Sequence, residues 1–502
     1  MSDGVLKTSS DIFNKFMEYY KINPLVLFRN YGDFGYITDN RNFGYNFTGT
    51  DFILGDQIVS ETGADILSCL EKQPLSINEI TDRVALLFEI EEGYNLQKDI
   101  VEFLDLLNMK GFVIKGESLQ ECNKDNIPYV LGTNRINCQN SYKKECELIE
   151  TQEFLGKWFG DSPFPTSIHV EIVSECNERC IHCYIPHELK TELMDDKFFY
   201  RILDQAQEMK LLHITISGGE PMLHPHFVDF IKRCREYDMS VNVLSNLTLL
   251  DENMIREMKN NPLLSVQTSV YSMRPEVHDG ITRHKNSLKK TCTSVRKLIE
   301  NGIPVQLSCP IMNANYDSYK SVQQWAFKQK VPLGFDYSII AKYNHDKENL
   351  SCRVSDEELY EFIADKMTND SSYIEDLEKE IADNKKKSAD DYICSVCNSS
   401  ICISPQGNVY PCVGWSDRIV GNLNHDTLKN IWLKSGEIKE LRSIRRKDIQ
   451  KCKSCLQKDY CSVCMVRNSN ESSTGNPFEV SKYFCNIAKI KKRLYESKKI
   501  EP

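Results

Sequence analysis

The sequence predicts an α/β protein in which a partial barrel of six β/α units lies between a small N-terminal α+β domain and a cysteine-rich C-terminal domain. Three observations predict this arrangement. Strand-like and helix-like segments alternate over residues 167–339, three helical segments precede them, and nine of the 20 cysteines lie between Cys394 and Cys485. A chain of 502 residues has room for about three domains.

The N-terminal domain is expected over residues 1–115. Its second helix should begin at Ser76, because Ser76 and Glu79 have the spacing of a capping box. Gly111 marks the end of the third helix. Three helices followed by a short strand are typical of a winged helix. The expected strands are 24–28, 34–38, 45–47 and 112–114, and the expected helices lie near 62–70, from 76, and over about 96–110.

A winged helix often binds DNA, but the charge of this one argues against it. Residues 62–114 hold ten acidic and four basic side chains, a difference of −6. Contacts to phosphates need the opposite sign. The sequence therefore favours a peptide-binding use of this domain, and a domain that serves only in packing remains open.

The barrel is expected over residues 166–340, after a polar linker at 116–165. Strands joined by amphipathic helices pair in parallel through right-handed crossovers. The six expected strands are 167–173, 212–217, 240–245, 264–270, 304–310 and 333–339. Residues 341–391 are highly charged and helical in pattern, so we expect a solvated helical bridge. It leads to the cysteine-rich domain over 392–502.

Overall composition excludes several functions. The net charge of −10 and the pI near 5.6 disfavour general binding to nucleic acid or to an anionic membrane. The N-terminus lacks a signal-peptide pattern and no apolar run approaches 18 residues, so a cytoplasmic location is expected. In a reducing compartment, 20 cysteines indicate metal or catalytic thiolates and not disulfides.

The strand at 167–173 leads into a loop with Cys176, Cys180 and Cys183 in C-x3-C-x2-C spacing. A structural zinc ion would need a fourth ligand. Three thiolates on a four-iron cubane leave one iron open to a chelating small molecule. The loop also follows a barrel strand, where α/β barrels place their chemistry.

Further motifs follow the next strands: Ser-Gly-Gly-Glu-Pro at 217–221, Ser-Asn-Leu-Thr at 245–248 and Gln-Thr-Ser-Val-Tyr at 267–271. Glycines let a ligand approach the main chain closely. With the three cysteines, these motifs resemble those of the radical S-adenosylmethionine (radical SAM) superfamily.

The resemblance implies a (β/α)6 radical SAM barrel. Cys176, Cys180 and Cys183 would hold a catalytic [4Fe–4S] cluster whose fourth iron binds SAM. Contacts to the amino group of SAM would come from Gly218, Gly219 and Glu220, and Asn246 and Ser269 would contact its sugar and carboxylate. His182 takes a position often held by an aromatic residue. Reduced by one electron, the cluster would cleave SAM to a 5′-deoxyadenosyl radical.

The C-terminal domain holds two groups of thiols. The first is Cys394, Cys397, Cys402 and Cys412, and the second is Cys452, Cys455, Cys461 and Cys464, followed by Cys485. Two C-x2-C pairs indicate a tetrahedral metal site, but spacing alone leaves zinc and iron–sulfur about equally favoured.

The order of these cysteines after Gly407 resembles a SPASM domain. It departs from the family pattern at one point, because two residues separate Cys461 from Cys464 where the family has three. The resemblance implies two auxiliary [4Fe–4S] clusters, and thus three in all. The outer cluster would be held by Cys452, Cys455, Cys461 and Cys485. The inner one would be held by Cys412 and Cys464 with ligands from Cys394, Cys397 and Cys402, a choice that the sequence leaves open.

The N-terminal pattern resembles a RiPP recognition element, which binds the leader of a ribosomal precursor peptide. The three parts in this order resemble peptide maturases of the sactipeptide and ranthipeptide type. We therefore expect an oxidoreductase that joins a substrate cysteine to an α- or β-carbon. Its partners would be the precursor peptide and a one-electron reductant of flavodoxin or ferredoxin type. The alternatives are another radical modification (C–C or C–O crosslinking, decarboxylation or epimerisation) or a non-catalytic winged-helix and zinc-ribbon regulator.

Overall fold

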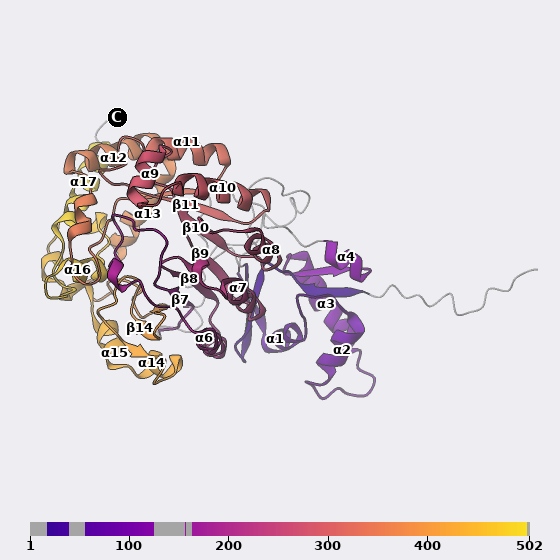
Figure 1. Ribbon diagram of the computed structural model, residues 1–502. Coiled ribbons are helices and arrows are strands. Elements are labelled where there is room, and N and C mark those ends of the chain that lie inside the picture. The colour runs from indigo at the N-terminus through magenta and orange to yellow at the C-terminus, as the bar shows by residue number, and fades with distance from the viewer. Residues whose placement is uncertain (1–17, 40–55, 125–155, 157–162, 499–502) are drawn as a thin grey trace, which may run out of the picture. The chain divides into compact units, whose positions relative to one another are not determined.

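A computed structural model describes residues 18–39, 56–124, 156 and 163–498. The chain divides into two compact units, residues 1–158 and 159–502 (Figure 1). Each unit has its own hydrophobic core. The two are described separately below.

The described part of the first unit contains two small antiparallel sheets and four helices. The sheet orders are β5-β1-β6 and β2-β3-β4. The strands are β1 Tyr19–Ile22, β2 Val26–Asn30, β3 Phe34–Asp39, β4 Asp56–Ser60, β5 Leu75–Ser76 and β6 Val113–Gly116. The helices are α1 Glu61–Ser68, α2 Ile77–Ala85, α3 Leu96–Met109 and α4 Leu119–Lys124.

The local signals in this unit act as expected. The Ser76 hydroxyl accepts a hydrogen bond from the Glu79 amide at 3.3 Å, and the Glu79 carboxylate accepts one from the Ser76 amide at 2.8 Å. This capping box satisfies amides that the first turn of α2 leaves free. The expected strand at 45–47 lies outside the described residues. The winged-helix class of the unit stays a prediction.

The second unit contains the six predicted parallel strands, and this prediction is confirmed. They are β7 Ser167–Val173, β8 His213–Gly218, β9 Ser240–Leu244, β10 Ser265–Ser269, β11 Val305–Pro310 and β12 Leu333–Asp336. Each strand pairs in parallel with the next along the chain. This places the loops that follow the strands at one end of the sheet.

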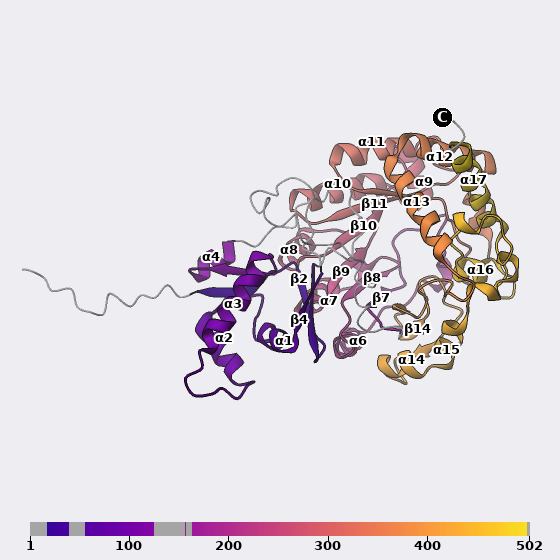
Figure 2. The same ribbon diagram turned by 180° about the vertical axis from the view of Figure 1, so that it is seen from behind.

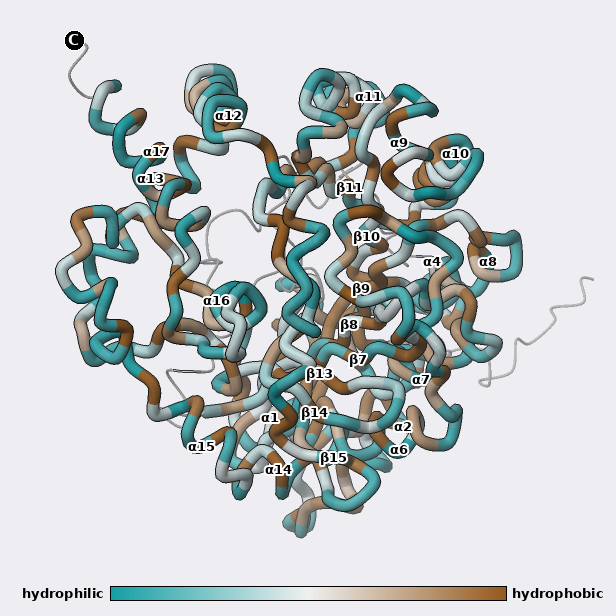
Figure 3. Tube along the Cα trace, turned by 60° about the vertical axis from the view of Figure 1, so that its left-hand side comes forward, coloured by the Kyte–Doolittle hydropathy of each residue, from teal (hydrophilic) through white to brown (hydrophobic). Residues whose placement is uncertain are grey.

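Helices connect the strands and lie along the outside of the sheet (Figures 1 and 2). Their apolar faces join the strands in one core. The connecting helices are α6 Asp196–Glu208, α7 Phe227–Glu236, α8 Glu252–Asn260, α9 Pro275–Thr282, α10 Ser287–Glu300 and α11 Tyr319–Gln329. In Figure 3 the strands of this unit are largely brown, whereas much of the helical surface is teal.

The C-terminal segment extends the same sheet. β13 Ser400–Ile403 pairs in parallel with β7, and β14 Asn408–Tyr410 and β15 Gly421–Asn422 follow it in antiparallel order. The described part of this unit therefore has one sheet of nine strands, β12-β11-β10-β9-β8-β7-β13-β14-β15. The sequence suggests separate barrel and cysteine-rich domains, whereas main-chain hydrogen bonds join them into one compact unit.

The charged segment before β13 forms two amphipathic helices, α12 Asp356–Asn369 and α13 Ser371–Lys386. Their charged faces are exposed, but each helix also buries apolar side chains, among them Phe362 and Leu377. The segment therefore forms part of the hydrophobic core as well as a connection. Four further helices complete the unit: α14 Leu428–Lys434, α15 Gly436–Ser443, α16 Met465–Glu471 and α17 Lys482–Lys498.

Among the described residues, every helix is too short or too polar to cross a membrane.

Candidate active site

The three-cysteine loop forms one wall of a cavity at the end of the barrel strands. Cys176, Cys180 and Cys183 follow β7 and line a cavity of about 280 Å³. Two amides of the loop donate hydrogen bonds of 2.9 and 3.0 Å to carbonyl groups at the end of α9. The fold thus holds the three thiols in a fixed loop beside a common space.

Burial favours the protonated form of the Cys176 and Cys180 thiols until a metal binds. It raises the pKa of Cys176 to about 11, and that of Cys180 well above its ordinary value. Nearby negative charge adds to both effects, since Glu178 lies close to both sulfurs. The thiolates needed as ligands therefore form when a metal displaces their protons.

The last residue of β8, Gly218, and the next residue, Gly219, also line the cavity. Gly218 has a φ of +133°, and a Cβ atom there would lie 1.8 Å from the Val173 carbonyl oxygen. A Cβ atom on Gly219 would lie 2.1 Å from the Glu175 carbonyl oxygen. Only glycine fits both positions, because the main chain at the end of β8 passes directly against the main chain at the end of β7.

Glu220 is fully buried and does not line the cavity. Its carboxylate accepts hydrogen bonds from the Ser245 hydroxyl and the Asn246 amide, each at 2.7 Å, and from the Met222 amide at 3.0 Å. Burial raises its pKa to about 7 although these donors oppose the shift. In this structure Glu220 fixes the turn after β9, which carries Asn246.

Two other residues predicted to contact SAM lie beside the same space, and the contacts themselves stay a prediction. Asn246 and Ser269 both line the cavity. The Asn246 side chain donates a 2.8 Å hydrogen bond to Asn177 on the cysteine loop. The His182 ring packs edge-on against Tyr271, with 5.2 Å between centroids. The structure therefore brings three cysteines, two glycines, Asn246, Ser269 and His182 to one space.

The chemistry of the cavity lining fits a polar cofactor. The Nδ1 atom of His182, the Oε1 atom of Gln267 and the Oγ1 atom of Thr268 are buried and have no hydrogen-bond partner among the described residues. All three side chains line the cavity. SAM offers an adenine, a ribose and an amino acid group that could satisfy such atoms.

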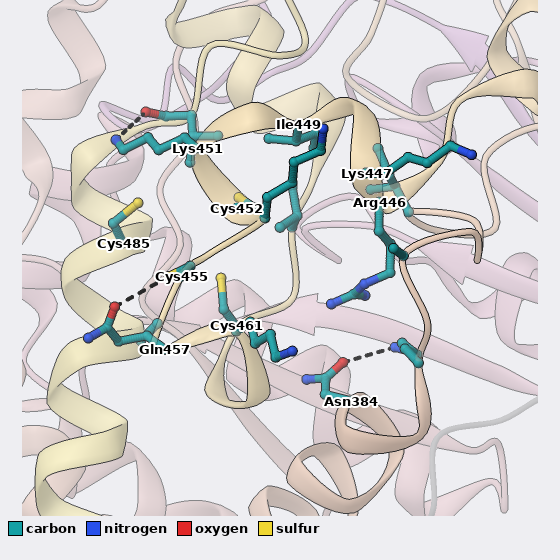
Figure 4. Close-up of a pocket in the computed structure, with 18 of the residues that line it drawn as sticks. Asn384, Arg446, Lys447, Ile449, Lys451, Cys452, Cys455, Gln457, Cys461 and Cys485 are labelled. Atoms are coloured by element: carbon teal, nitrogen blue, oxygen red, sulfur yellow. Dashed lines mark hydrogen bonds between the residues drawn. The ribbon is translucent and has the colours of Figure 1, made fainter.

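A second cavity, of about 660 Å³, is lined by the four thiols expected to hold the outer cluster: Cys452, Cys455, Cys461 and Cys485. Three of them, Cys452, Cys461 and Cys485, face the same space in Figure 4. Burial raises the pKa of Cys461 to about 11, and the charges of the other three thiols add to the shift. Four thiols around one space are the donor set of a cubane cluster.

The inner thiols also form a group. Burial raises the pKa of Cys412 to about 12, and nearby Cys464 and Cys394 add to it. Burial, Cys412 and Cys394 together raise the pKa of Cys397 to about 12. These four sulfurs therefore lie close enough to act on one another.

Cys402 lies close to Cys412, as the other inner thiols do, but it also has two polar neighbours. Its sulfur lies within 4.8 Å of a ring nitrogen of His169 and a carboxylate oxygen of Glu171. Burial raises the pKa of Glu171 to about 7 and lowers that of His169 to about 4. His169 also lines the cavity beside the three-cysteine loop. This polar trio was not predicted as a group, although the alternation of β7 puts residues 169 and 171 on one face.

Known proteins resemble this chain in both cysteine-bearing regions. Residues 170–325 match the radical SAM superfamily, and residues 394–456 match the SPASM iron–sulfur cluster-binding domain. The chain is 25% identical over 329 residues to the antilisterial bacteriocin subtilosin biosynthesis protein AlbA of Bacillus subtilis, covering 62% of this chain and 70% of AlbA. It is 30% identical over 155 residues to the PqqA peptide cyclase of Xanthomonas campestris pv. campestris, covering 30% of this chain and 41% of the cyclase.

Solved structures share the fold. The crystal structure of Streptococcus suis SuiB bound to precursor peptide SuiA has a TM-score of 0.56 and 16% identity, covering 92% of this chain and 99% of SuiB. Native anSMEcpe with bound AdoMet has a TM-score of 0.53 and 16% identity, covering 67% of this chain and 98% of that protein. The parallel barrel and the domain matches contradict the alternative of a non-catalytic zinc-ribbon regulator.

Proposed function

We propose that this chain, whose residues 170–325 match the radical SAM superfamily and whose sheet continues into the region that matches a SPASM domain, is a maturase that forms thioether crosslinks in a ribosomal precursor peptide. The observation that carries the proposal is the placement of three thiol groups in one compact unit: one beside the glycine-rich cavity and two in the SPASM region. AlbA acts in the biosynthesis of a bacteriocin, the PqqA peptide cyclase acts on a peptide, and SuiB binds a precursor peptide, and these relationships support a peptide substrate.

The two domains indicate SAM and iron–sulfur clusters as cofactors. We propose three [4Fe–4S] clusters. The first is held by Cys176, Cys180 and Cys183, which leave one iron for SAM. The outer cluster takes Cys452, Cys455, Cys461 and Cys485. For the inner cluster we propose Cys394, Cys397, Cys412 and Cys464, because Cys402, although it also lies close to Cys412, packs against His169 and Glu171.

When bound, SAM and its cluster supply a 5′-deoxyadenosyl radical that takes a hydrogen atom from the substrate. The residues of the chain position and shield this chemistry. Gly218 and Gly219 let the cofactor approach the main chain, and Glu220 holds the turn that carries Asn246. The side chains of His182 and Gln267 offer buried polar atoms to it.

A crosslink from a cysteine sulfur to an α- or β-carbon removes two hydrogens from the peptide. One would be taken from the carbon as a hydrogen atom, and the thiol would lose the other as a proton, so that one electron would remain to be accepted. Clusters held by the thiols of the SPASM region would give the chain an acceptor for this electron. A reductant of flavodoxin or ferredoxin type would supply the electron that starts the cycle. The proposal includes a cytoplasmic location, where such carriers and free thiols occur.

The first unit is proposed to bind the leader of the precursor. It carries two small sheets whose edge strands could accept an extended peptide as an added strand. Among the described residues 62–114 the acidic excess opposes binding to nucleic acid. Removing residues 1–158 should weaken binding of a leader-bearing peptide and leave SAM cleavage intact. Unchanged peptide affinity would reject the recognition role.

The decisive test of the radical assignment is the triple variant Cys176→Ala/Cys180→Ala/Cys183→Ala. After anaerobic purification it should keep the iron of the auxiliary clusters and lose SAM cleavage. A triple variant that still cleaves SAM would refute the assignment.

A second candidate reaction is carbon–carbon crosslinking, which the match to the PqqA peptide cyclase favours. Both crosslinks lower the mass of the co-expressed peptide by two hydrogens. Iodoacetamide separates them, because a thioether consumes the cysteine thiol and a carbon–carbon bond leaves it open to alkylation. Full alkylation of the crosslinked peptide would reject thioether formation. Decarboxylation and epimerisation are separated by mass alone, since neither gives a loss of two hydrogens.

A further inference from the structure

The cavity over the outer thiols is strongly basic although the chain as a whole is acidic. Eight cationic side chains line it, and no Asp or Glu is among its lining residues. The net charge of the whole chain is −10, so this is a local reversal of sign. The cations are Lys387, Arg446, Lys447, Lys451, Lys453, Lys458, Lys482 and Lys489. We call this set the basic ring.

Most of the basic ring is exposed to solvent, Arg446 being half-buried. Lys447 forms an ion pair with exposed Asp390. Asp391 also lies close to Arg446 and Lys387, and Asp448 close to Lys447, so these acids screen part of the charge of the ring. Lys387 and Lys451 donate to a side-chain amide and a main-chain carbonyl, and neither acceptor carries a negative charge. The ring therefore projects positive potential outward from the thiols at its centre.

The same surface offers an apolar contact. Leu456 is 78% exposed and follows Cys455 in the loop between the two C-x2-C pairs. Cys452, Cys455, Cys461 and Cys485 are all partly exposed. The surface thus combines an exposed apolar residue, a group of thiols and a surrounding set of positive charges. Such a combination is typical of an interface at which charge attracts and orients a partner protein.

We infer that the basic ring is the docking surface for an acidic one-electron carrier protein of flavodoxin type, with Leu456 at the contact. The inference rests on the proposed iron–sulfur chemistry of the outer thiols. The exchange is a single electron: the outer cluster would pass on the electron left by the crosslink and return from the 1+ to the 2+ state, while the oxidised flavin of the carrier takes up that electron and one proton. The thiols beneath the ring favour a redox protein over a nucleic acid or membrane as the occupant.

The test compares two charge-reversal variants of the full chain, each loaded with its clusters, by their affinity for flavodoxin. Lys453→Glu/Lys458→Glu/Lys489→Glu changes three exposed lysines of the ring that lack an ion pair among the described residues. The matched control, Lys259→Glu/Lys289→Glu/Lys328→Glu, makes the same charge change on exposed positions of α8, α10 and α11. The probe is a purified acidic flavodoxin, and its affinity is measured by titration at about 50 mM and 500 mM salt.

We expect the ring variant to lose at least tenfold in flavodoxin affinity at low salt, and the control to lose less than threefold. Wild-type affinity should fall at high salt, because the salt screens exposed charges. Equal loss in both variants, or wild-type affinity that does not depend on salt, would overturn the inference. Binding to phosphatidylglycerol vesicles without binding to flavodoxin would overturn it too.

Two measurements keep this test separate from the proposed function. Iron content of the ring variant shows whether the lysines serve only to balance cluster charge. If iron is lost, Lys453→Gln/Lys458→Gln/Lys489→Gln replaces the reversal, and full flavodoxin affinity in that variant would overturn the inference. SAM cleavage driven by dithionite should be equal in wild type and both variants, because this small reductant needs no docking surface. Its absence in wild type would refute the proposed function and leave the docking result standing.

Discussion

His169 on β7 and Cys402 on β13 face each other across a parallel strand pair, with a ring nitrogen and the sulfur within 4.8 Å. One residue belongs to the first barrel strand and the other to the SPASM region. Their pairing fixes Cys402 relative to the cavity beside the three-cysteine loop, because β13 is joined to β7 by main-chain hydrogen bonds. The inner thiols are thus positioned by the barrel sheet itself.

This placement predicts that Cys402 is not a cluster ligand. Cys402→Ser should keep the iron content of wild type, because the sulfur faces an imidazole and a carboxyl group. Cys412→Ser should lose iron, since Cys412 is grouped with Cys394 and Cys464. Iron and sulfide analysis of anaerobically reconstituted protein measures both. Loss of about four irons per chain in Cys402→Ser would contradict the prediction.

Substitution of the glycine that follows β8 should damage the site. A Cβ atom in Gly219→Ala would overlap the Glu175 carbonyl, so we expect a loss of stability on the order of 3 kcal/mol and no measurable SAM binding. Gly280→Ala is the control, because no atom lies within 4 Å of its added Cβ and the residue is helical. Alanine there should stabilise the protein by up to about 1 kcal/mol. Thermal melts and SAM titration report both effects, and wild-type behaviour of Gly219→Ala would show that the close approach is wrong.

Glu220 is predicted to act through the turn at Asn246. In Glu220→Gln an amide donor replaces one of the two oxygens that together accept three hydrogen bonds. A cost of about 2 kcal/mol is expected for such a buried mismatch. SAM affinity should fall roughly 10-fold as the turn moves. Glu236→Gln on the exposed face of α7 is the control and should leave affinity unchanged. Full affinity in Glu220→Gln would rule out this positioning role.

Acid should destabilise the protein partly through His213. Burial lowers its pKa from 6.5 to about 4, so the folded state favours the neutral ring. Stability from this group is complete above pH 6.5 and is lost as the pH falls toward 4, because only the unfolded chain takes up the proton. The loss at pH 5 is about 2 kcal/mol. Between pH 7 and pH 5 the melting temperature of His213→Gln should therefore fall by less than that of wild type. An equal acid shift in both proteins would contradict the assignment.

Local chemistry made much of this protein predictable. The capping box at Ser76 and Glu79 specifies where α2 begins, since both partners lie within one turn. Alternating strand and helix patterns specify the six barrel strands, because each must bury a continuous apolar face. The three-cysteine loop and the glycine pair were recognisable because their spacing is short and their main-chain geometry is local.

Other features depend on residues that only the fold brings together. Glu220 was expected to contact the cofactor, yet in the structure it is buried beneath the turn at Asn246, 26 positions along the chain. The polar trio around Cys402 joins strands more than 200 residues apart. The basic ring brings together Lys387 after α13, the lysines that flank Cys452 and Cys455, and Lys482 and Lys489 of α17, which lie far apart in the sequence.

The sequence by itself determined the kinds of elements and the ligand chemistry, because spacing along one strand, turn or loop is fixed by local backbone geometry. Only the tertiary structure decided which thiols share a space and which charges surround them. These depend on strand register and helix packing between distant segments, where the free energy comes from burying many side chains together and no single pattern records the outcome.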